Sequence, residues 1–124
     1  MFKTSTKDEG DAAEARALAH LRRHGLALVQ RNYRIARGPA ARGGEIDLIV
    51  REPDGTLVFV EVRRRRSGGF GGSAASIGAR TRASIVFAAQ HFLRRYAALP
   101  PCRFDVVAVD GDELQWLRAA FDAP

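Results

Sequence analysis

Cysteine is almost absent from this sequence, since Cys102 is the single thiol among 124 residues. One cysteine cannot build an internal disulfide framework, and such a chain suits a reducing compartment. No stretch approaches the roughly 18 consecutive apolar residues of a membrane-spanning helix. The segment from Met1 to Gly10 is polar and charged, unlike the apolar core of a signal peptide. We therefore expect a cytoplasmic protein without a membrane partner.

Lysine is also scarce, because 18 of the 20 basic residues are arginine. This bias runs through the whole chain and is not confined to one segment. The formal net charge is +6 and the sequence pI is about 10.6. A surplus of arginine creates a positive potential that attracts phosphate. The charge makes nucleic acid, and DNA in particular, a candidate partner, although many basic proteins have no such role.

The length of the chain and a hydrophobic fraction of 46% suit one compact domain with one ordinary core. We expect this domain to span 1–124, with 1–7 as a disordered tail. Apolar residues at helical spacing predict a helix from Asp8 to His24. Acids lie in its first turn and basic residues in its last turn, as the helix dipole favours, and Gly25 provides a natural end.

The remainder of the chain alternates between strand patterns, loops and one further helix pattern. The expected elements are a strand at Leu26 to Arg34, a loop at Ala36 to Gly44, strands at 45–52 and 56–64, a glycine-rich connection at Ser67 to Ser73, a helix at Ala74 to Tyr96, and strands at Phe104 to Val109 and Leu114 to Leu117. The order is αβββαββ. Helices before and after the strands indicate an α/β or α+β sandwich, with a mixed sheet flanked by helices.

The segment at 44–66 reads GEIDLIVREPDGTLVFVEVRRRR and sets acids into an otherwise apolar hairpin. Pro53 and Gly55 occupy the second and fourth positions of its turn. They predict a type I turn closed by a left-handed glycine, which makes a three-residue hairpin loop. In that register, Asp47 faces Glu61.

The same register makes the opposite face of the hairpin wholly apolar and fit for a core. The residues of that face are Ile46, Leu48, Val50, Val58, Val60 and Val62. A two-residue turn would mix acids with valines on each face, so the three-residue loop is favoured on packing. On the acidic face, Ile49 faces Phe59 and Glu45 faces Arg63. The two apolar residues there indicate that a helix covers that half of the face.

Two carboxylates directly opposite each other destabilise a hairpin unless something compensates them. A shared proton, an arginine and a divalent cation are the three possible compensations. Carboxylate oxygens with free positions for water and phosphate suit Mg²⁺, and Arg63 lies two residues beyond Glu61. The alternative is a solvated strand face with weak cross-strand ion pairs. The spacing alone leaves these possibilities open.

Several short motifs follow one another along the chain in a recognisable order. They are Gly10 with Glu14, Asn32 with Arg34, GEIDLI at 44–49, FVEV at 59–62, Phe70 with Gly71, and RFDVV at 103–107. Their order and spacing, from about residue 8 to residue 117, resemble the YraN-like family of uncharacterised bacterial proteins.

That family is similar to the restriction-endonuclease-like nuclease superfamily, which includes restriction enzymes and Holliday-junction resolvases. The resemblance implies a restriction-endonuclease-like core and a phosphodiesterase site that uses Mg²⁺ or Mn²⁺. By position, Glu14, Asp47 and Glu61 would be the metal ligands, and together with Arg63 they would form the catalytic set. Glu45 belongs to the family motif, and we expect it at the rim of the site. Resolvases act as dimers, so a homodimer is a further possibility.

Arg63 departs from the superfamily pattern, which has lysine at this position. A guanidinium can neutralise a developing negative charge but cannot act as a base, because it does not lose its proton in a protein. The replacement can reflect the arginine bias of the whole chain. A lysine expected near the start of the second helix is also absent, and Thr81 stands there between Arg80 and Arg82.

The remaining candidates for nucleic-acid binding are Arg63, Arg65, Phe70 and Arg80. Alternate arginines of the run at 63–66 point to opposite faces, and the run is equally typical of a solvated strand end. Phe70 could stack on an unpaired base. We therefore expect a metal-dependent nuclease-like protein that binds, and could cleave, structured or branched DNA. The alternatives are a binding module with a degenerate nuclease site and a basic protein that docks an acidic protein.

Overall fold

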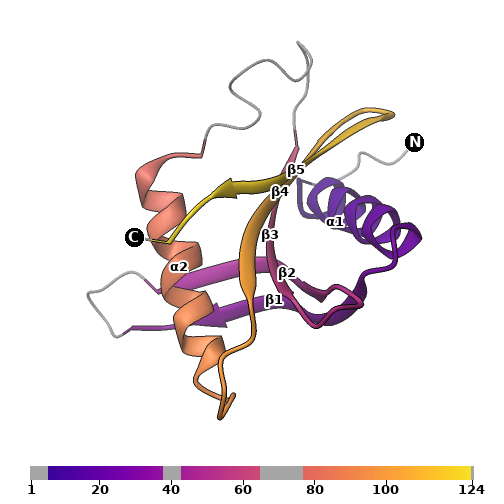
Figure 1. Cartoon of the computed structure of the whole chain (residues 1–124). Coiled ribbons are helices and arrows are strands. Elements are labelled where there is room, and N and C mark those ends of the chain that lie inside the picture. The colour runs from indigo at the N-terminus through magenta and orange to yellow at the C-terminus, as the bar shows by residue number, and fades with distance from the viewer. Residues whose placement is uncertain (1–5, 38–42, 65–76, 124) are drawn as a thin grey trace.

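The computed structural model describes residues 6–37, 43–64 and 77–123, which form two helices and five strands in the order αβββαββ (Figure 1). The helices are α1 (Thr6–Arg23) and α2 (Ala79–Leu93). The strands are β1 (Ala27–Ile35), β2 (Gly44–Arg51), β3 (Leu57–Arg64), β4 (Cys102–Asp110) and β5 (Glu113–Phe121). The predicted element order is confirmed. None of the described helices is both long and apolar enough to cross a membrane.

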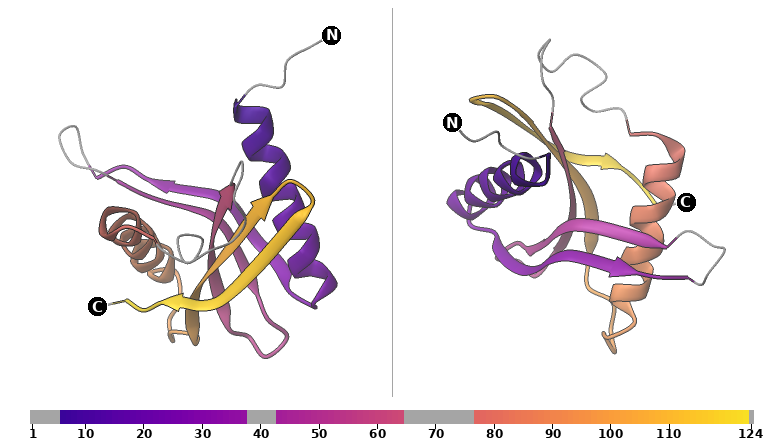
Figure 2. Two further views of the ribbon diagram at one scale, coloured as in Figure 1. Left: turned by 90° about the horizontal axis from the view of Figure 1, so that it is seen from above. Right: turned by 180° about the vertical axis from the view of Figure 1, so that it is seen from behind.

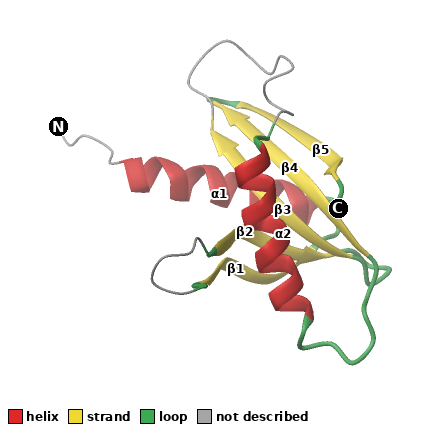
Figure 3. Ribbon diagram, turned by 90° about the vertical axis from the view of Figure 1, so that its left-hand side faces the viewer, coloured by secondary structure: helices red, strands yellow, loops and turns green. Residues whose placement is uncertain are grey.

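All five strands belong to one mixed sheet with the order β1-β2-β3-β4-β5. The pair β3·β4 is parallel, and the other three pairs are antiparallel. The chain passes from β3 to β4 by way of α2, as a parallel pair requires a crossover. Figure 2 shows the sheet between α1 and α2, and Figure 3 shows α2 lying across the strands on the side away from α1. The expected sheet flanked by helices is therefore confirmed.

The bounds of both helices differ from the expectation. Helix α1 already begins at Thr6, so Thr6 and Lys7 are helical and do not belong to a tail. An ion pair between Lys7 and Asp11, one turn apart, stabilises this first turn. Helix α2 begins after Gly78, whose backbone is extended, and ends at Leu93. It ends before the expected Tyr96 because its last predicted turn closes through bonds to carbonyl groups three residues back. The expected first residues, 74–76, lie outside the described part of the chain.

Two hydrophobic clusters fill the two sides of the sheet. Between α1 and the sheet lie Ala13, Ala17, Leu18, Leu21, Leu48, Val50, Val58, Val60 and Val107. Between α2 and the sheet lie Ile46, Ile49, Phe59, Ile85, Ala88, Phe92 and Phe104. Placing Ile46 on the same face as Leu48 was wrong. Ile46 packs in the cluster on the α2 side, whereas Leu48 packs in the cluster on the α1 side.

Asp105 is the buried charge that joins β4 to β5. Its carboxylate is fully buried and accepts hydrogen bonds from Arg103 Nε at 2.9 Å, Trp116 Nε1 at 2.9 Å and the Ala119 backbone N–H at 2.9 Å. Arg103 also pairs with Glu52 in the β2–β3 turn. The β4–β5 register shifts at this point, and Ala119 has a positive φ of 50°. Asp105 therefore satisfies a guanidinium, an indole N–H and a backbone N–H at once.

Gly44 allows α2 to lie directly against the first residue of β2. A Cβ atom at this position would lie 2.5 Å from the Ser84 carbonyl oxygen and 2.8 Å from the Ala88 backbone nitrogen. Both are backbone atoms, so only a shift of the whole helix could relieve the contact. The close approach also lets the Glu45 backbone N–H donate to Ser84 Oγ at 3.2 Å.

Asp105→Ala should destabilise the fold strongly, because it removes the acceptor for three donors and leaves the Arg103 charge without this partner. Breaking a buried, hydrogen-bonded charge pair costs about 3–5 kcal/mol. Urea denaturation measures the loss. Asp112→Ala, which removes an exposed carboxylate near the β4–β5 turn, is the matched control. Equal losses in the two variants would contradict the role given to Asp105.

Gly44→Ala should lower the free energy of unfolding by about 1–3 kcal/mol, the usual cost of forcing extra volume into a packed contact. Gly78→Ala is the control, because a Cβ atom there would meet nothing within 4 Å. Thermal or urea unfolding of both variants makes the comparison. A Gly44→Ala protein as stable as the control would show that α2 does not need this approach.

Candidate functional site

The β2–β3 hairpin has the predicted register. Glu52 N–H donates to the Thr56 carbonyl oxygen at 2.9 Å, Gly55 N–H donates to the Glu52 carbonyl oxygen at 2.9 Å, and Gly55 has a positive φ of 96°. The ladder pairs Ile49 with Phe59 and Leu48 with Val60. The three-residue loop is therefore confirmed, and it aligns Asp47 with Glu61 at the next step.

The ladder ends before Asp47 because the Asp47 carboxylate takes the place of a backbone acceptor. Its Oδ2 accepts the Val62 N–H at 2.8 Å. Strands β2 and β3 separate at this point, and the two carboxyl groups meet at the open end of the hairpin. Asp47 and Glu61 are both half-buried and line one hollow. They do not diverge to opposite sides of the sheet.

The first turns of α2 form the other wall of this hollow. Its polar lining consists of Glu45, Asp47 and Glu61 from the sheet and Arg80, Thr81 and Ser84 from the helix. The contact at Gly44 holds the helix wall at this distance. We call these six residues the carboxylate hollow.

A proton shared between Asp47 and Glu61 compensates their charges in the absence of a cation. Burial, the charge of Asp47 and a hydrogen bond between the two carboxyl groups together raise the pKa of Glu61 to about 8, and burial has the largest effect. Burial also raises the pKa of Asp47, while the Val62 N–H and the bond with Glu61 oppose that rise. Near neutral pH, Glu61 therefore keeps its proton and donates it to Asp47. A cation would displace this proton and hold both carboxylates in their charged form.

Arg63 lies beside the pair without neutralising it. Its Nη1 is 4.0 Å from Glu61 Oε2, at the outer limit of an ion pair. Arg63 lowers the pKa of Glu61, but this effect is smaller than those of burial and Asp47. Arg63 does not line the carboxylate hollow, so the arginine that does so is Arg80.

Glu45 lies at the rim of the hollow but faces a partner other than the one expected. The expected pairing with Arg63 is wrong, because β2 and β3 have separated before that step. Glu45 is instead opposite Arg34 on β1, and their side chains form an ion pair of 3.2 Å between Arg34 Nε and Glu45 Oε1. The charge of Glu45 raises the pKa of both Asp47 and Glu61.

Glu14 is half-buried on α1 and close enough to respond to the same charges. Burial is the largest cause that raises the pKa of Glu14, and the charges of Asp47 and Asp11 also raise it. The charge of Arg31 lowers it. Glu14 does not line the carboxylate hollow. Within residues 6–37, 43–64 and 77–123, no three acidic, histidine or cysteine side chains gather closely enough to hold a metal ion. Asp47 and Glu61 therefore meet as a pair, and metal binding by Asp47, Glu61 and Glu14 stays a prediction.

Two predicted nucleic-acid contacts, Arg65 and Phe70, lie outside the described residues.

His20 and His24, one turn apart on α1, pack against each other and against Trp116, with ring centroids 5.8 Å and 5.4 Å from the indole. Ser84, Arg37 and Phe87 line the hollows but were not predicted as site residues from the sequence. The small residues Ser84 and Ala88, spaced by four on α2, were the available signal that a glycine packs there.

The raised pKa of Glu61 predicts that the stability of the protein falls as the pH rises. The folded protein keeps a proton up to a pKa of about 8, whereas the unfolded chain releases it near the ordinary value of 4.5. The folded state therefore binds more protons between these values, so the free energy of unfolding decreases with rising pH across that window. Glu61→Gln removes the titrating group and should lose this part of the dependence.

Urea denaturation in EDTA at several pH values within that window tests this. Glu113→Gln, an exposed glutamate of β5, is the control and should keep the pH dependence of the wild type. The same pH dependence in wild type and Glu61→Gln would rule out a buried shared proton.

Comparisons with known proteins identify the family of the chain. Residues 13–109 match the model of the uncharacterised protein family UPF0102. A UPF0102 protein of Methylibium petroleiphilum is 60% identical over 119 residues, which cover 96% of this chain and 98% of the relative. A UPF0102 protein of Paracidovorax citrulli is 62% identical over 121 residues, covering 98% of this chain and 87% of the relative. The chain therefore belongs to the UPF0102 family, the uncharacterised bacterial family whose motifs its sequence carries.

Proposed function

We propose that this protein is a metal-dependent nuclease-like protein that binds, and hydrolyses, structured or branched DNA. The observation that carries the proposal is the half-buried pair Asp47 and Glu61 at the open end of the hairpin. Partly buried carboxylates with raised pKa values, next to arginine in a hollow, are typical of functional sites. If this pair were purely structural, apolar residues at both positions would make the fold more stable, because unpaired buried carboxyl groups weaken a fold.

The donor set of the hollow fits Mg²⁺ or Mn²⁺. These ions bind through one or two carboxylates and keep several positions for water and phosphate oxygens. Asp47 and Glu61 would hold the ion, and Glu14 would orient water or a second ion. When bound, the ion would polarise a phosphodiester and lower the pKa of a bound water. Because the ion itself would lower the pKa of the attacking water, hydrolysis would not need a lysine at position 63.

The arginines around the hollow have a separate task, which is to bind the substrate. Arg63 and Arg80 approach from β3 and from the first turn of α2, respectively. The first turn of α2 contains no acidic residue, so its helix dipole adds to the positive charge. A phosphate that reaches the carboxylates meets positive charge on two sides, and this charge opposes the build-up of negative charge during hydrolysis.

The likeness to restriction-endonuclease-like nucleases supports the proposal by position. The helical Glu14, the strand Asp47 and Glu61 followed by Arg63 correspond to the metal-binding pattern of that superfamily. The departure at Arg63 favours a second candidate, a module that holds DNA with the same surface but does not cut it. In both candidates the arginine surface binds DNA. They differ in whether the DNA is hydrolysed at the carboxylates.

The nuclease proposal predicts cleavage that depends on both a divalent cation and the carboxylate pair. Linear, nicked and four-way-junction DNA would be incubated with the protein in Mn²⁺, in Mg²⁺ and in EDTA, and strand scission followed on gels. Scission should occur only with a cation. Asp47→Asn and Glu61→Gln should reduce it by about 100-fold or more, since even ligand-orienting residues of metal sites contribute 10–100-fold.

Glu113→Gln is the matched control, because it removes one carboxylate far from the hollow without changing its lining. Its scission should equal that of the wild type. Salt-sensitive DNA binding without scission under any of these conditions would select the binding module. Scission that persists in the Asp47→Asn and Glu61→Gln variants would reject the site.

A further inference from the structure

The carboxylate hollow continues as a groove along the outer side of α2. Arg80 and Ser84 line both the carboxylate hollow and a second hollow beside it. Arg37, Ala83 and Phe87 line this second hollow and also a third, which extends over the exposed face of the helix. Because neighbouring hollows share lining residues, the three lie next to one another in a row that leads away from the carboxylates. We call this row of hollows the α2 groove.

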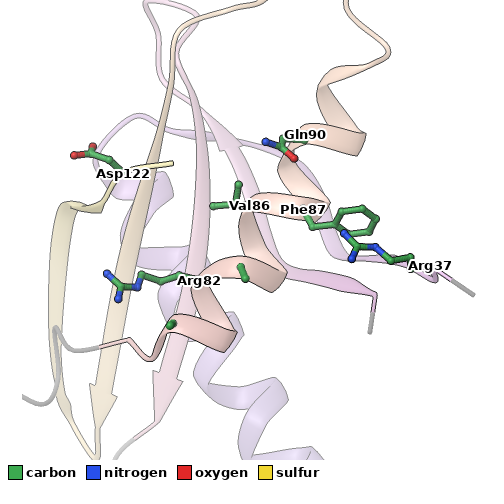
Figure 4. Close-up of a pocket in the computed structure, with 8 residues that line it drawn as sticks. Arg37, Arg82, Val86, Phe87, Gln90 and Asp122 are labelled. Carbon is green, nitrogen blue, oxygen red and sulfur yellow. The ribbon is translucent and has the colours of Figure 1, made fainter. Parts of the chain in front are cut away.

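The far part of the groove has a small apolar floor between polar sides. Ala79, Ala83 and Val86 lie on one face of α2 and form the floor. In Figure 4, Arg82 and Asp122 stand on one side, and Arg37 and Phe87 stand on the other. Side chains as small as alanine at two successive turns make the helix surface concave there.

A stacked pair of side chains, Arg37 and Phe87, marks the wall of this groove. The guanidinium carbon of Arg37 lies 4.0 Å from the centroid of the Phe87 ring. Such a distance is that of cation–π stacking, in which the ring holds the guanidinium flat. One face of the guanidinium contacts Phe87, and Arg37 is exposed to solvent. The arrangement presents a planar, positively charged surface to the groove.

The charge along the groove is strongly positive. Arg80, Arg37 and Arg82 follow one another from the carboxylate hollow outward. Within the described ranges 6–37, 43–64 and 77–123, none of the three forms an ion pair with a carboxylate. The sequence of α2 contains no aspartate or glutamate, and Asp122 is the acid that lines the outer end. An occupant of this groove is therefore expected to be an anionic chain.

We propose that the α2 groove binds an unpaired DNA strand that leads away from the carboxylate hollow, with a base stacked on the guanidinium of Arg37. This inference rests on the proposed function, because it names the part of the substrate that lies next to the scissile phosphate. The three arginines contact successive phosphates, and Phe87 holds Arg37 in the stacking orientation.

A single strand fits these features better than a duplex or an acidic protein. In a duplex, each base is already stacked on its neighbours, so its face is not accessible to a side chain. Base stacking on an aromatic or guanidinium plane, combined with a positive groove along the backbone, is the general mode of single-strand binding. An acidic peptide would satisfy the arginines but would gain nothing from the flat surface of Arg37.

The test compares two DNAs in EDTA, where no cleavage can occur: a blunt duplex and the same duplex with an unpaired tail. Fluorescence anisotropy with labelled DNA gives both affinities. The wild type should bind the tailed DNA about 10-fold more tightly, since stacking of one base is worth roughly that factor or more. Arg37→Lys keeps the charge but removes the plane, so it should abolish most of this preference and leave blunt-duplex affinity unchanged.

Two further variants separate stacking from charge and from folding. Arg23→Lys changes an exposed arginine at the end of α1, and it should leave the preference intact. Phe87→Leu retains an apolar side chain in this half-buried position but removes the ring, and it should reduce the preference as Arg37→Lys does. Equal wild-type affinity for the two DNAs, or equal effects of Arg37→Lys and Arg23→Lys, would overturn the proposal.

The same proteins assayed with Mn²⁺ distinguish failure of this inference from failure of the proposed function. Scission without any preference for a tail would support the nuclease site and reject the α2 groove as a strand-binding site. A preference for the tail without scission would support the groove and reject hydrolysis. The absence of DNA binding in all conditions would reject both.

Discussion

Repulsion between two half-buried carboxyl groups is the constraint around which this molecule is arranged. The hairpin register brings Asp47 opposite Glu61, and burial against α2 prevents water from screening them. The pair remains only because the Asp47 carboxylate accepts a backbone N–H and shares a proton with Glu61. Each of these compensations belongs to the cation-free protein. In the function proposed above, a divalent cation would displace the shared proton.

The rest of the fold holds this pair in place from two directions. On one side, Gly44 lets α2 approach β2 until the backbones of strand and helix touch. On the other, the buried carboxylate of Asp105 ties β4 and β5 together and, through Arg103, reaches the turn of the hairpin. The acids therefore sit on a rigid sheet, whereas the arginines come from surfaces that face solvent. In the proposed function, the acids would hold the ion and the arginines would attract the polyanion.

Much of the fold could be predicted from the sequence because its signals are local. The apolar period of α1, its charged ends and Gly25 were sufficient to place that helix, apart from its first residues. The turn at Pro53 and Gly55 determined the register, and the register determined that Asp47 and Glu61 meet. The partner of Glu45 could not be predicted in this way. Its pairing with Arg34 follows from the register of β1 against β2, which the turn of the β2–β3 hairpin does not determine.

The sequence by itself determined the element order, the hairpin register and the presence of two facing acids, because turn chemistry and side-chain periodicity act over a few residues. Only the tertiary structure decided which helix covers the acids, that Arg80 and not Arg63 lines their hollow, and that Arg37 stacks on Phe87. Arg37 and Phe87 are far apart in the chain. Their contact arises from the crossover that lays α2 across the sheet, a long-range arrangement that depends on packing of the whole core.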